Sequence, residues 1–322
     1  MNFLLLTNQI SNVITLTVLI ILGALLLLLA ICFLITYVIF KKAFGRDKNI
    51  ATETNPIYEQ YREFMKQGAE WFLALKPEKV TITSKDGLKL SGLFYETENA
   101  RGTVIFMHGY HGNPTHDFGP VLPHFKAEGY SLLLPDQRAH GESEGKYLTF
   151  GVKESEDCLL WAKYVAKRFP KRSISLHGIS MGGATVAMAS CLEDLPEEVK
   201  LIANDCGFTS PDEIISSVRK SMKLPKFPFQ YFVRFLAKTL AKFSLKEKNS
   251  SDCYAKSKLP ALFIHGEEDN FVPYYMGKEN YQKSSATDKI LISVKGAGHG
   301  LAYITEPERV RSELTEFYNK HM

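Results

Sequence analysis

The chain has 322 residues and a formal net charge of +4 at pH 7. It contains no internal repeat and no low-complexity tract, so the sequence does not predict a repeat architecture. The net charge is too small to indicate a partner by itself. Since no recognition motif or aromatic stacking platform accompanies the basic residues, we expect no nucleic-acid partner.

The first predicted element is an apolar run from Val13 to Phe40 that contains no charged residue. A helix rises about 1.5 Å per residue and needs roughly 20 residues to cross the hydrocarbon core of a bilayer. The run therefore predicts a transmembrane helix. A cleaved signal peptide is the alternative, but the run is about twice as long as a signal-peptide core, no basic residue precedes it and no small-residue cleavage site follows.

The charges that flank this run predict its orientation. No Lys or Arg precedes the run, whereas Lys41, Lys42, Arg46 and Lys48 follow it. By the positive-inside rule, the rest of the chain lies in the cytoplasm, and the protein crosses the cell membrane once. We therefore divide the chain into a membrane anchor with a basic collar, residues 1–48, and a second domain, residues 49–322.

The five cysteines agree weakly with that orientation. Cys32 lies in the predicted span, and the other four show neither paired spacing nor the spacing of metal ligands: Cys158, Cys191, Cys206 and Cys253. A reducing compartment suits such cysteines. An outward-facing domain with free thiols is the alternative.

The second domain begins with two predicted antiparallel strands around Asp86 and Gly87, because an Asp-Gly pair between alternating residues is a hairpin signal. Short apolar runs rich in β-branched residues then alternate with stretches of helical spacing. Runs that are apolar on both faces are typical of buried parallel strands. This order predicts an α/β domain with a mostly parallel sheet flanked by helices.

A candidate nucleophile follows one of these strands, residues 173–176, where the sequence reads Gly178-Ile179-Ser180-Met181-Gly182. This G-x-S-x-G pattern puts a serine on a sharp turn between a strand and a helix, with its hydroxyl beyond the sheet. The helix N-terminus adds unpaired N–H groups and a partial positive charge. The pattern is short, so an inert serine in a glycine-rich turn is the alternative.

A nucleophilic serine needs a base, and the base needs an acid that orients it. The loops after two later predicted strands supply Asp269 and then His299. Like Ser180, both follow the carboxyl ends of strands, which is where a parallel sheet gathers its site. Glu268 and Asp205 are alternative candidates for the acid.

The oxyanion that forms during acyl transfer needs two N–H donors. We expect them to be the backbone of Met181, directly after the serine, and the backbone of Tyr110 in the loop after the third strand. A metal site in that loop is the alternative reading, with four candidate ligands: His108, His111, His116 and Asp117. A catalytic zinc needs three convergent ligands. We expect neither a metal nor a cofactor.

These motifs resemble the α/β-hydrolase superfamily, and in particular membrane-anchored bacterial serine hydrolases akin to the monoacylglycerol-lipase and serine-aminopeptidase branches. The resemblance covers residues 75–320 roughly and rests on "HGYHGN", "DQRAHGESEG", "GISMGG", "GEEDNFVP" and "GAGHG". It implies the α/β-hydrolase fold and favours Asp269 as the acid, because "GEEDNFVP" matches the G-x-x-D-x-x-V-P loop of the family. It also implies that Asp136, Arg138 and His140 buttress the loop beside the serine.

Residues 212–258, approximately, form an insertion where members of this superfamily carry a cap. The insertion holds 11 Lys and Arg against 4 Asp and Glu, so the basic charge of the chain is concentrated there. Its central part predicts a basic amphipathic helix. One face would carry Phe232, Phe235, Leu236, Leu240 and Phe243, and another Arg234, Lys238 and Lys242. Such a helix can cover the site as a lid or lie on an anionic leaflet, and the two roles are compatible.

Together these features predict a membrane-anchored serine hydrolase that cleaves carboxylic esters, including lipid-like acyl esters, through an acyl-enzyme. Its partners would be a small or lipid-like acyl substrate and the membrane, which it contacts through the N-terminal helix and the basic cap. Peptidase or amidase action and acyl transfer use the same residues and are alternatives. A catalytically silent membrane-tethered binding protein is the alternative from a different class.

Overall fold

The computed structural model describes residues 2–46 and 61–322. An eight-stranded sheet in the order β1-β2-β4-β3-β5-β6-β7-β8 forms the centre of the domain. β1 (Glu78–Thr83), β2 (Lys89–Tyr95) and β4 (Tyr130–Pro135) pair antiparallel in that order. All remaining neighbours pair parallel, through β3 (Gly102–Met107), β5 (Ser173–Ile179), β6 (Val199–Asp205), β7 (Ala261–Gly266) and β8 (Lys289–Val294). The predicted α/β architecture is confirmed.

Helices cover both faces of the sheet because the side chains of each buried strand alternate between two apolar cores. In β3, Val104 and Phe106 belong to one core, and Ile105 and Met107 belong to the other. The first core is closed by α3 (Arg62–Ala74), α5 (Leu122–Ala127), α12 (Ala302–Thr305) and α13 (Pro307–His321). The second is closed by α6 (Glu154–Arg168), α7 (Met181–Ala189) and α10 (Ser250–Lys256). Two further helices are α4 (Pro114–Asp117) and α11 (Tyr274–Lys283).

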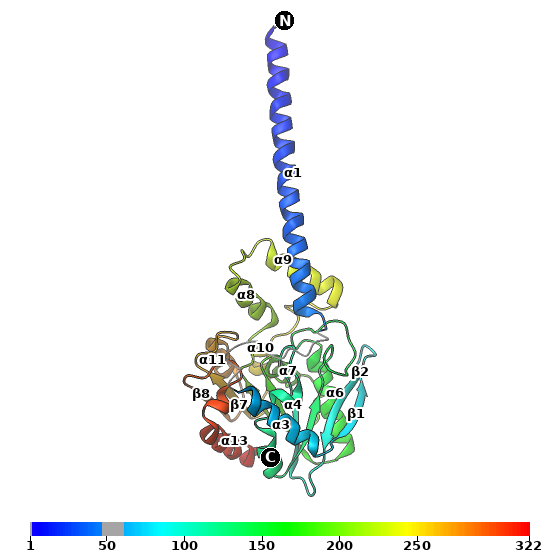
Figure 1. Cartoon of the computed structure of the whole chain (residues 1–322), viewed down its shortest axis with the longest axis vertical. Helices are drawn as coiled ribbons and strands as arrows, with labels where there is room; N and C mark the ends of the chain where they lie inside the picture. The colour runs from blue at the N-terminus through cyan, green and yellow to red at the C-terminus, as the bar shows by residue number, and fades with distance from the viewer. Residues whose placement is uncertain (1, 47–60) are drawn as a thin grey trace.

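The N-terminal helix α1 (Asn2–Phe44) is longer than the predicted run and leaves the domain as a single helix (Figure 1). Within residues 2–46 and 61–322, it is the one helix that is long and apolar enough to span a membrane, from Leu6 to Phe44. Of the basic residues that define the predicted collar, Lys48 lies outside the described residues. The predicted boundary at residue 48 also falls there.

The C-terminal end of α1 is packed into the second domain. Gly45 forms an antiparallel bridge with Tyr147, and the Phe44 carbonyl accepts a hydrogen bond of 2.9 Å from the N–H of Leu148. Phe40 and Phe44 are fully or almost fully buried in a third apolar core, which they share with the cap and with α7. The last turn of the helix is thus packed as part of the folded domain.

Between β6 and β7 the chain forms α8 (Pro211–Ser221), α9 (Phe229–Leu236), a π-helix (Ala237–Ala241) and α10. α10 packs on α7 and α11, which flank the sheet. α8 and α9 lie instead at the end of the domain from which α1 leaves, and α1 packs on α9 (Figure 1).

The structure corrects the predicted amphipathic helix. α9 gives way to the π-helix after Leu236, and this wider turn shifts the register of the residues that follow. Leu236 and Phe243 are buried as expected, but Phe235 is 56% exposed. Arg234 is not a free basic residue, because both its Nε and its Nη2 donate to the carboxylate of Asp212 on α8.

Two cysteines without a recognisable sequence spacing are paired. Cys191 follows α7, Cys253 lies on α10, and the two form a disulfide with their Cα atoms 5.1 Å apart. The expectation that the cysteines are unpaired is therefore wrong for these two, because the packing of α10 on α7 brings together residues 62 positions apart. Disulfides are typical of oxidising compartments, so this pair argues against the orientation that the flanking charges predict.

Candidate active site

Ser180 occupies a turn between β5 and α7 that leaves no room for a side chain at Gly178 or Gly182. Its backbone has φ 55° and ψ −115°, a conformation that a residue other than glycine adopts only under constraint. A Cβ atom on Gly178 would overlap the Gly182 carbonyl, and one on Gly182 would overlap the Met107 carbonyl at the end of β3. The two glycines of the motif therefore allow the helix to begin directly against the sheet.

The structure brings together the three residues predicted as nucleophile, base and acid. The Ser180 Oγ lies 2.8 Å from the Nε2 of His299, and the Nδ1 of His299 lies 2.7 Å from an Oδ of Asp269. Ser180, His299 and Asp269 lie in the loops that follow β5, β8 and β7, respectively. This chain of hydrogen bonds can carry a proton from the serine hydroxyl to the imidazole, with the carboxylate fixing the ring.

The carboxylate of Asp269 is buried and has four hydrogen-bonding partners. One oxygen accepts the N–H groups of Phe271 and Val272, each at 2.9 Å. The other lies 2.7 Å from His299 and 3.3 Å from the Nε2 of His265. Burial alone would raise the pKa of Asp269, but the hydrogen bonds to His265 and His299 outweigh it and hold that pKa well below its ordinary value. The carboxylate is therefore ionised at neutral pH.

Neither alternative acid occupies this position. Glu268 is exposed. Asp205, at the end of β6, has a buried oxygen without a hydrogen-bond partner, and burial raises its pKa to about 6. His299 directs its Nδ1 to Asp269 instead. His265 is a second histidine that contacts the carboxylate of Asp269. The sequence analysis did not identify His265, because this residue belongs to none of the motifs.

The two backbone positions predicted to bind the oxyanion, Met181 and Tyr110, belong to segments that lie next to Ser180. Met181 is the first residue of α7. The loop that carries Tyr110 passes directly beside the serine, because a Cβ on Gly109 would lie 3.5 Å from the Cβ of Ser180. Tyr110 and Ser180 line the same cavity. Their role as oxyanion donors remains a prediction.

Two of the four candidate metal ligands of that loop, His108 and Asp117, accept backbone N–H groups through their side chains and so hold the loop in place. The Nε2 of His108 accepts the N–H of Gln137 at 2.9 Å, and the Nε2 of His140 accepts the N–H of His111 at 3.1 Å. Burial, reinforced by the neighbouring His108, lowers the pKa of His140 well below its ordinary value, so His140 is neutral and can accept. Asp117 accepts the N–H of Gly109 at 2.8 Å.

The D-x-R-x-H-G motif buttresses the site as the resemblance implies. The guanidinium of Arg138 binds both oxygens of Asp157 on α6, at 2.7 and 2.8 Å, and also binds Asp86 of the first hairpin. Asp136 accepts the N–H of Glu142 at 2.8 Å and closes the loop on itself. Gln137 accepts the hydroxyl of Thr185 on α7 and thereby ties this loop to the helix that follows Ser180.

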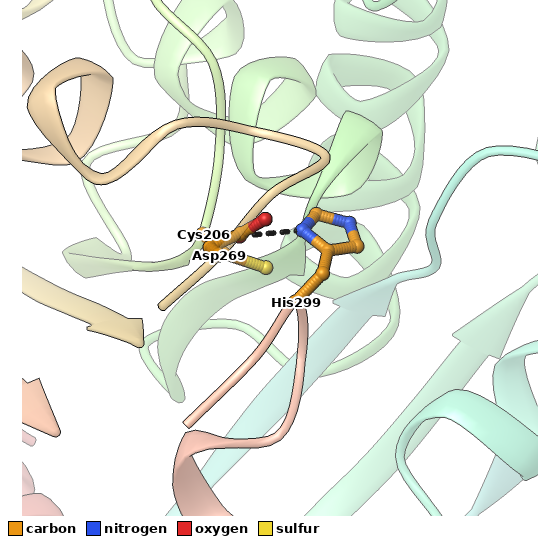
Figure 2. A group of neighbouring side chains, drawn as sticks. All are labelled: Cys206, Asp269 and His299. Carbon is orange, nitrogen blue, oxygen red and sulfur yellow. Dashed lines mark hydrogen bonds and ion pairs between the residues drawn. The ribbon is translucent and has the colours of Figure 1, made fainter. Parts of the chain in front are cut away.

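One group of side chains in the described residues has the composition of a metal site, and it overlaps the hydrogen-bonded pair (Figure 2). Ligand atoms of Cys206, Asp269 and His299 lie within 4.8 Å of one another. Burial, followed by the charges of Asp205 and Asp269, raises the pKa of Cys206 well above its ordinary value. The imidazole of His299 and the carboxylate of Asp269 bind each other directly. Their closeness is therefore explained by this hydrogen bond.

Ser180 opens into a cavity of about 160 Å³ that is almost entirely apolar. Its walls come from the C-terminal part of α1, the loop at Phe150, the segment at Phe208, α8, α9 and Phe271. The lining side chains that carry polar groups are Thr36, Tyr110, Ser180, Arg219 and Gln230. Sequence reasoning did not assign any part of α1 to the site, because only the fold brings residues 36–44 next to residue 180.

Comparisons with known proteins agree with this architecture. A family model described as alpha/beta hydrolase fold matches residues 102–249. The chain is 25% identical over 253 residues to the uncharacterized protein YqkD of Bacillus subtilis, covering 77% of this chain and 81% of that protein. It is also 25% identical over 223 residues to the uncharacterized membrane protein YNL320W of Saccharomyces cerevisiae, with 69% and 73% covered.

Among solved structures, the esterase Pf2001 of Pyrococcus furiosus resembles this chain with a TM-score of 0.62 and 27% identity. The alignment covers 78% of this chain and 95% of the esterase.

Proposed function

Because this chain is a member of the alpha/beta hydrolase superfamily, we propose that it is a serine esterase whose triad is Ser180, His299 and Asp269. The hydrogen-bonded sequence of 2.8 Å and 2.7 Å from the serine hydroxyl through the imidazole to the carboxylate is the observation that carries this proposal. The similarity to an esterase over most of the domain supports it.

In this mechanism the Ser180 Oγ attacks the acyl carbonyl while His299 takes the hydroxyl proton on Nε2. The ionised Asp269 stabilises the imidazolium that forms, and the backbone N–H groups of Tyr110 and Met181 bind the tetrahedral oxyanion. Removing one such donor costs roughly 10²–10³ in kcat in related chemistry. The imidazolium then protonates the leaving alcohol as the carbon–oxygen bond breaks. Water, deprotonated by His299, hydrolyses the acyl-serine and restores the enzyme.

The lining of the cavity supports an ester with an aliphatic acyl group over a peptide. Aromatic and aliphatic side chains surround the space beyond Ser180, and it has few polar groups with which to pair peptide N–H and C=O groups. Burying unpaired peptide groups costs about 1–3 kcal/mol each, whereas each buried methylene gains about 0.8 kcal/mol. An acyl chain is therefore the better occupant.

The proposal also includes the membrane. In this proposal, α1 anchors the enzyme in a single pass of the cell membrane, and the Lys and Arg residues that directly follow the apolar run support a cytoplasmic location of the hydrolase domain. Reporter domains fused to the C-terminus test this orientation: one that fluoresces only in the cytoplasm should be active, and one that needs an oxidising compartment should not. The opposite pattern would favour an oxidising compartment outside the cytoplasm for the hydrolase domain, where the Cys191–Cys253 disulfide is stable.

The first test of the catalytic proposal is labelling of membranes that contain the full-length protein with a fluorophosphonate probe. Wild type should be labelled and should hydrolyse p-nitrophenyl esters, and Ser180→Ala should do neither. A folded wild type that neither reacts with the probe nor cleaves any ester would contradict the esterase proposal. It would favour the alternative, a catalytically silent membrane-tethered binding protein. Competing alcohols and amines in the product analysis separate hydrolysis from acyl transfer.

A further inference from the structure

The cavity next to Ser180 is walled on one side by the N-terminal helix itself. Five residues of α1 line it, at helical intervals of three, one, three and one: Thr36, Ile39, Phe40, Ala43 and Phe44. Residues with this spacing share one face of a helix, so they form a continuous stripe over two turns. The helix that is apolar enough to anchor the protein thus also closes the site.

This wall is held firmly against the cap and the hydrolase domain. Phe33, one turn before the stripe, packs edge-on against Phe232 of α9 with ring centroids 5.2 Å apart. At the other end of the stripe, backbone hydrogen bonds join Phe44 to Leu148 and Arg46 to Lys146. The stripe is therefore fixed at both ends, and the cavity has a defined shape between α1, α8 and α9.

The length of α1 sets the level of this cavity relative to a bilayer. Residues 13–35 alone extend about 34 Å as a helix, enough to cross a hydrocarbon core of about 30 Å. If these residues cross the core, the stripe begins where the core ends, and the exposed Lys41 and Lys42 would lie at the level of the lipid headgroups. The cap beside α1 exposes large apolar side chains, among them Phe227 at 67% and Phe235 at 56%.

From this arrangement we propose that the stripe of α1 is part of the acyl-binding site and that the substrate is an ester of a bilayer lipid. Its acyl chain enters from the leaflet along α1 and lies between α1 and the cap helices α8 and α9. This inference rests on the proposed esterase function, because the acyl chain in this cavity is the one that the reaction at Ser180 would release from the ester. Ile39 and Ala43, which are partly buried in the wall, set the length of chain that fits.

Larger side chains in the wall test the site. Ile39→Trp and the milder Ala43→Leu would fill the cavity from the α1 side. Val38→Trp is the matched control, because Val38 lies on the same helix, is 60% exposed and is not part of the lining. The readout is the ratio of kcat/KM for p-nitrophenyl decanoate to that for p-nitrophenyl acetate, with the full-length protein in vesicles.

For Ile39→Trp we expect this ratio to fall at least about tenfold, which corresponds to lost contacts with roughly two buried methylenes. Ala43→Leu should lower it in the same direction, and Val38→Trp should leave it unchanged. If both lining variants are labelled by the fluorophosphonate probe and keep the ratio of the wild type, the inference is wrong while the esterase proposal stands. If the wild type is not labelled, the esterase proposal itself has failed.

The route of entry has a separate test. A long-chain ester dissolved in the same vesicles as the enzyme should be hydrolysed faster than the same ester supplied in separate vesicles, whereas the soluble acetate ester should show no difference. Equal rates for the long-chain ester in the two arrangements would overturn entry from the bilayer.

Discussion

Phe33 of the N-terminal helix α1 and Phe232 of the cap helix α9 form an edge-to-face pair with ring centroids 5.2 Å apart. The two residues belong to segments about 200 positions apart in the chain, so their contact couples α1 to the cap. Because α9 also walls the cavity next to Ser180, this contact links the position of α1 to the shape of that cavity.

Removing either ring should loosen the cap. An edge-to-face pair contributes about 1 kcal/mol beyond its buried area, so Phe33→Ala and Phe232→Ala should each raise the opening of the cap loop, residues 222–228, about fivefold. The measurement is the rate of trypsin cleavage after Lys223, an exposed residue of this loop, followed by mass spectrometry in full-length protein.

The double variant should open little more than either single variant if the rings act through each other. Leu34→Ala is the control, because Leu34 is 62% exposed on α1 and should leave the cleavage rate unchanged. Additive effects of the two phenylalanine variants would show that they act independently.

Asp269 and its neighbour Glu268 offer a matched pair for testing the acid. Asp269→Asn removes the charge that stabilises the imidazolium and should lower kcat by about 10⁴-fold, as in a comparable triad. Glu268→Gln makes the same chemical change on an exposed side chain and should alter kcat by less than about twofold. Steady-state hydrolysis of a short p-nitrophenyl ester measures both. Similar losses in the two variants would contradict the assignment of Asp269.

Much of this site could be predicted from the sequence, because each motif is local. The sharp turn at Ser180 needs only Gly178 and Gly182 beside it, and the loops of Asp269 and His299 directly follow apolar strands. In a parallel sheet the carboxyl ends of the strands meet at one edge, so the order of the motifs brings these loops to one place. The mostly parallel sheet follows from the same alternation of apolar runs and helices.

The parts that could not be predicted depend on packing between distant segments. Ala43 lines the cavity only because backbone bonds fix the end of α1 to the loop at Leu148, and no pattern in residues 36–44 indicates this. The pair Cys191–Cys253 needs α10 to pack on α7. The π-helix at 237–241 interrupts a pattern that reads as one amphipathic helix, since periodicity alone does not reveal a wider turn.

The turn at Ser180 provides a steric prediction about stability. Gly182→Ala places a methyl group on the carbonyl of Met107 in β3, which cannot move without disturbing the sheet. We expect a loss of stability on the order of 3 kcal/mol or more. Gly23→Ala, on α1, is the control, because its new methyl group meets nothing within 4 Å. Thermal unfolding of the detergent-solubilised protein compares the two, and a Gly182→Ala variant as stable as the wild type would contradict the packing of α7 against β3.

Asp205 predicts a pH dependence of stability. Burial raises its pKa from 3.8 to about 6, so between these values the folded state binds the proton more tightly than the unfolded state. Stability contributed by this group therefore falls as the pH rises through that window, and the loss is complete above a pH of about 6. Asp205→Asn keeps the size of the side chain and removes the charge. At pH 7.5 it should be more stable than the wild type by up to about 3 kcal/mol, and at pH 4 the two should differ little.

Unfolding of both proteins at the two pH values measures this difference. Asp194→Asn, at a side chain that is 75% exposed, should show no comparable gain at pH 7.5. Because Asp205 lies beside His265 and His299, its charge also acts on them. A variant that gains stability and also loses esterase activity would mean that the buried carboxylate is kept near the triad for function, at the expense of stability. A variant with no gain at pH 7.5 would contradict the conclusion that burial of the Asp205 carboxylate lowers stability at that pH.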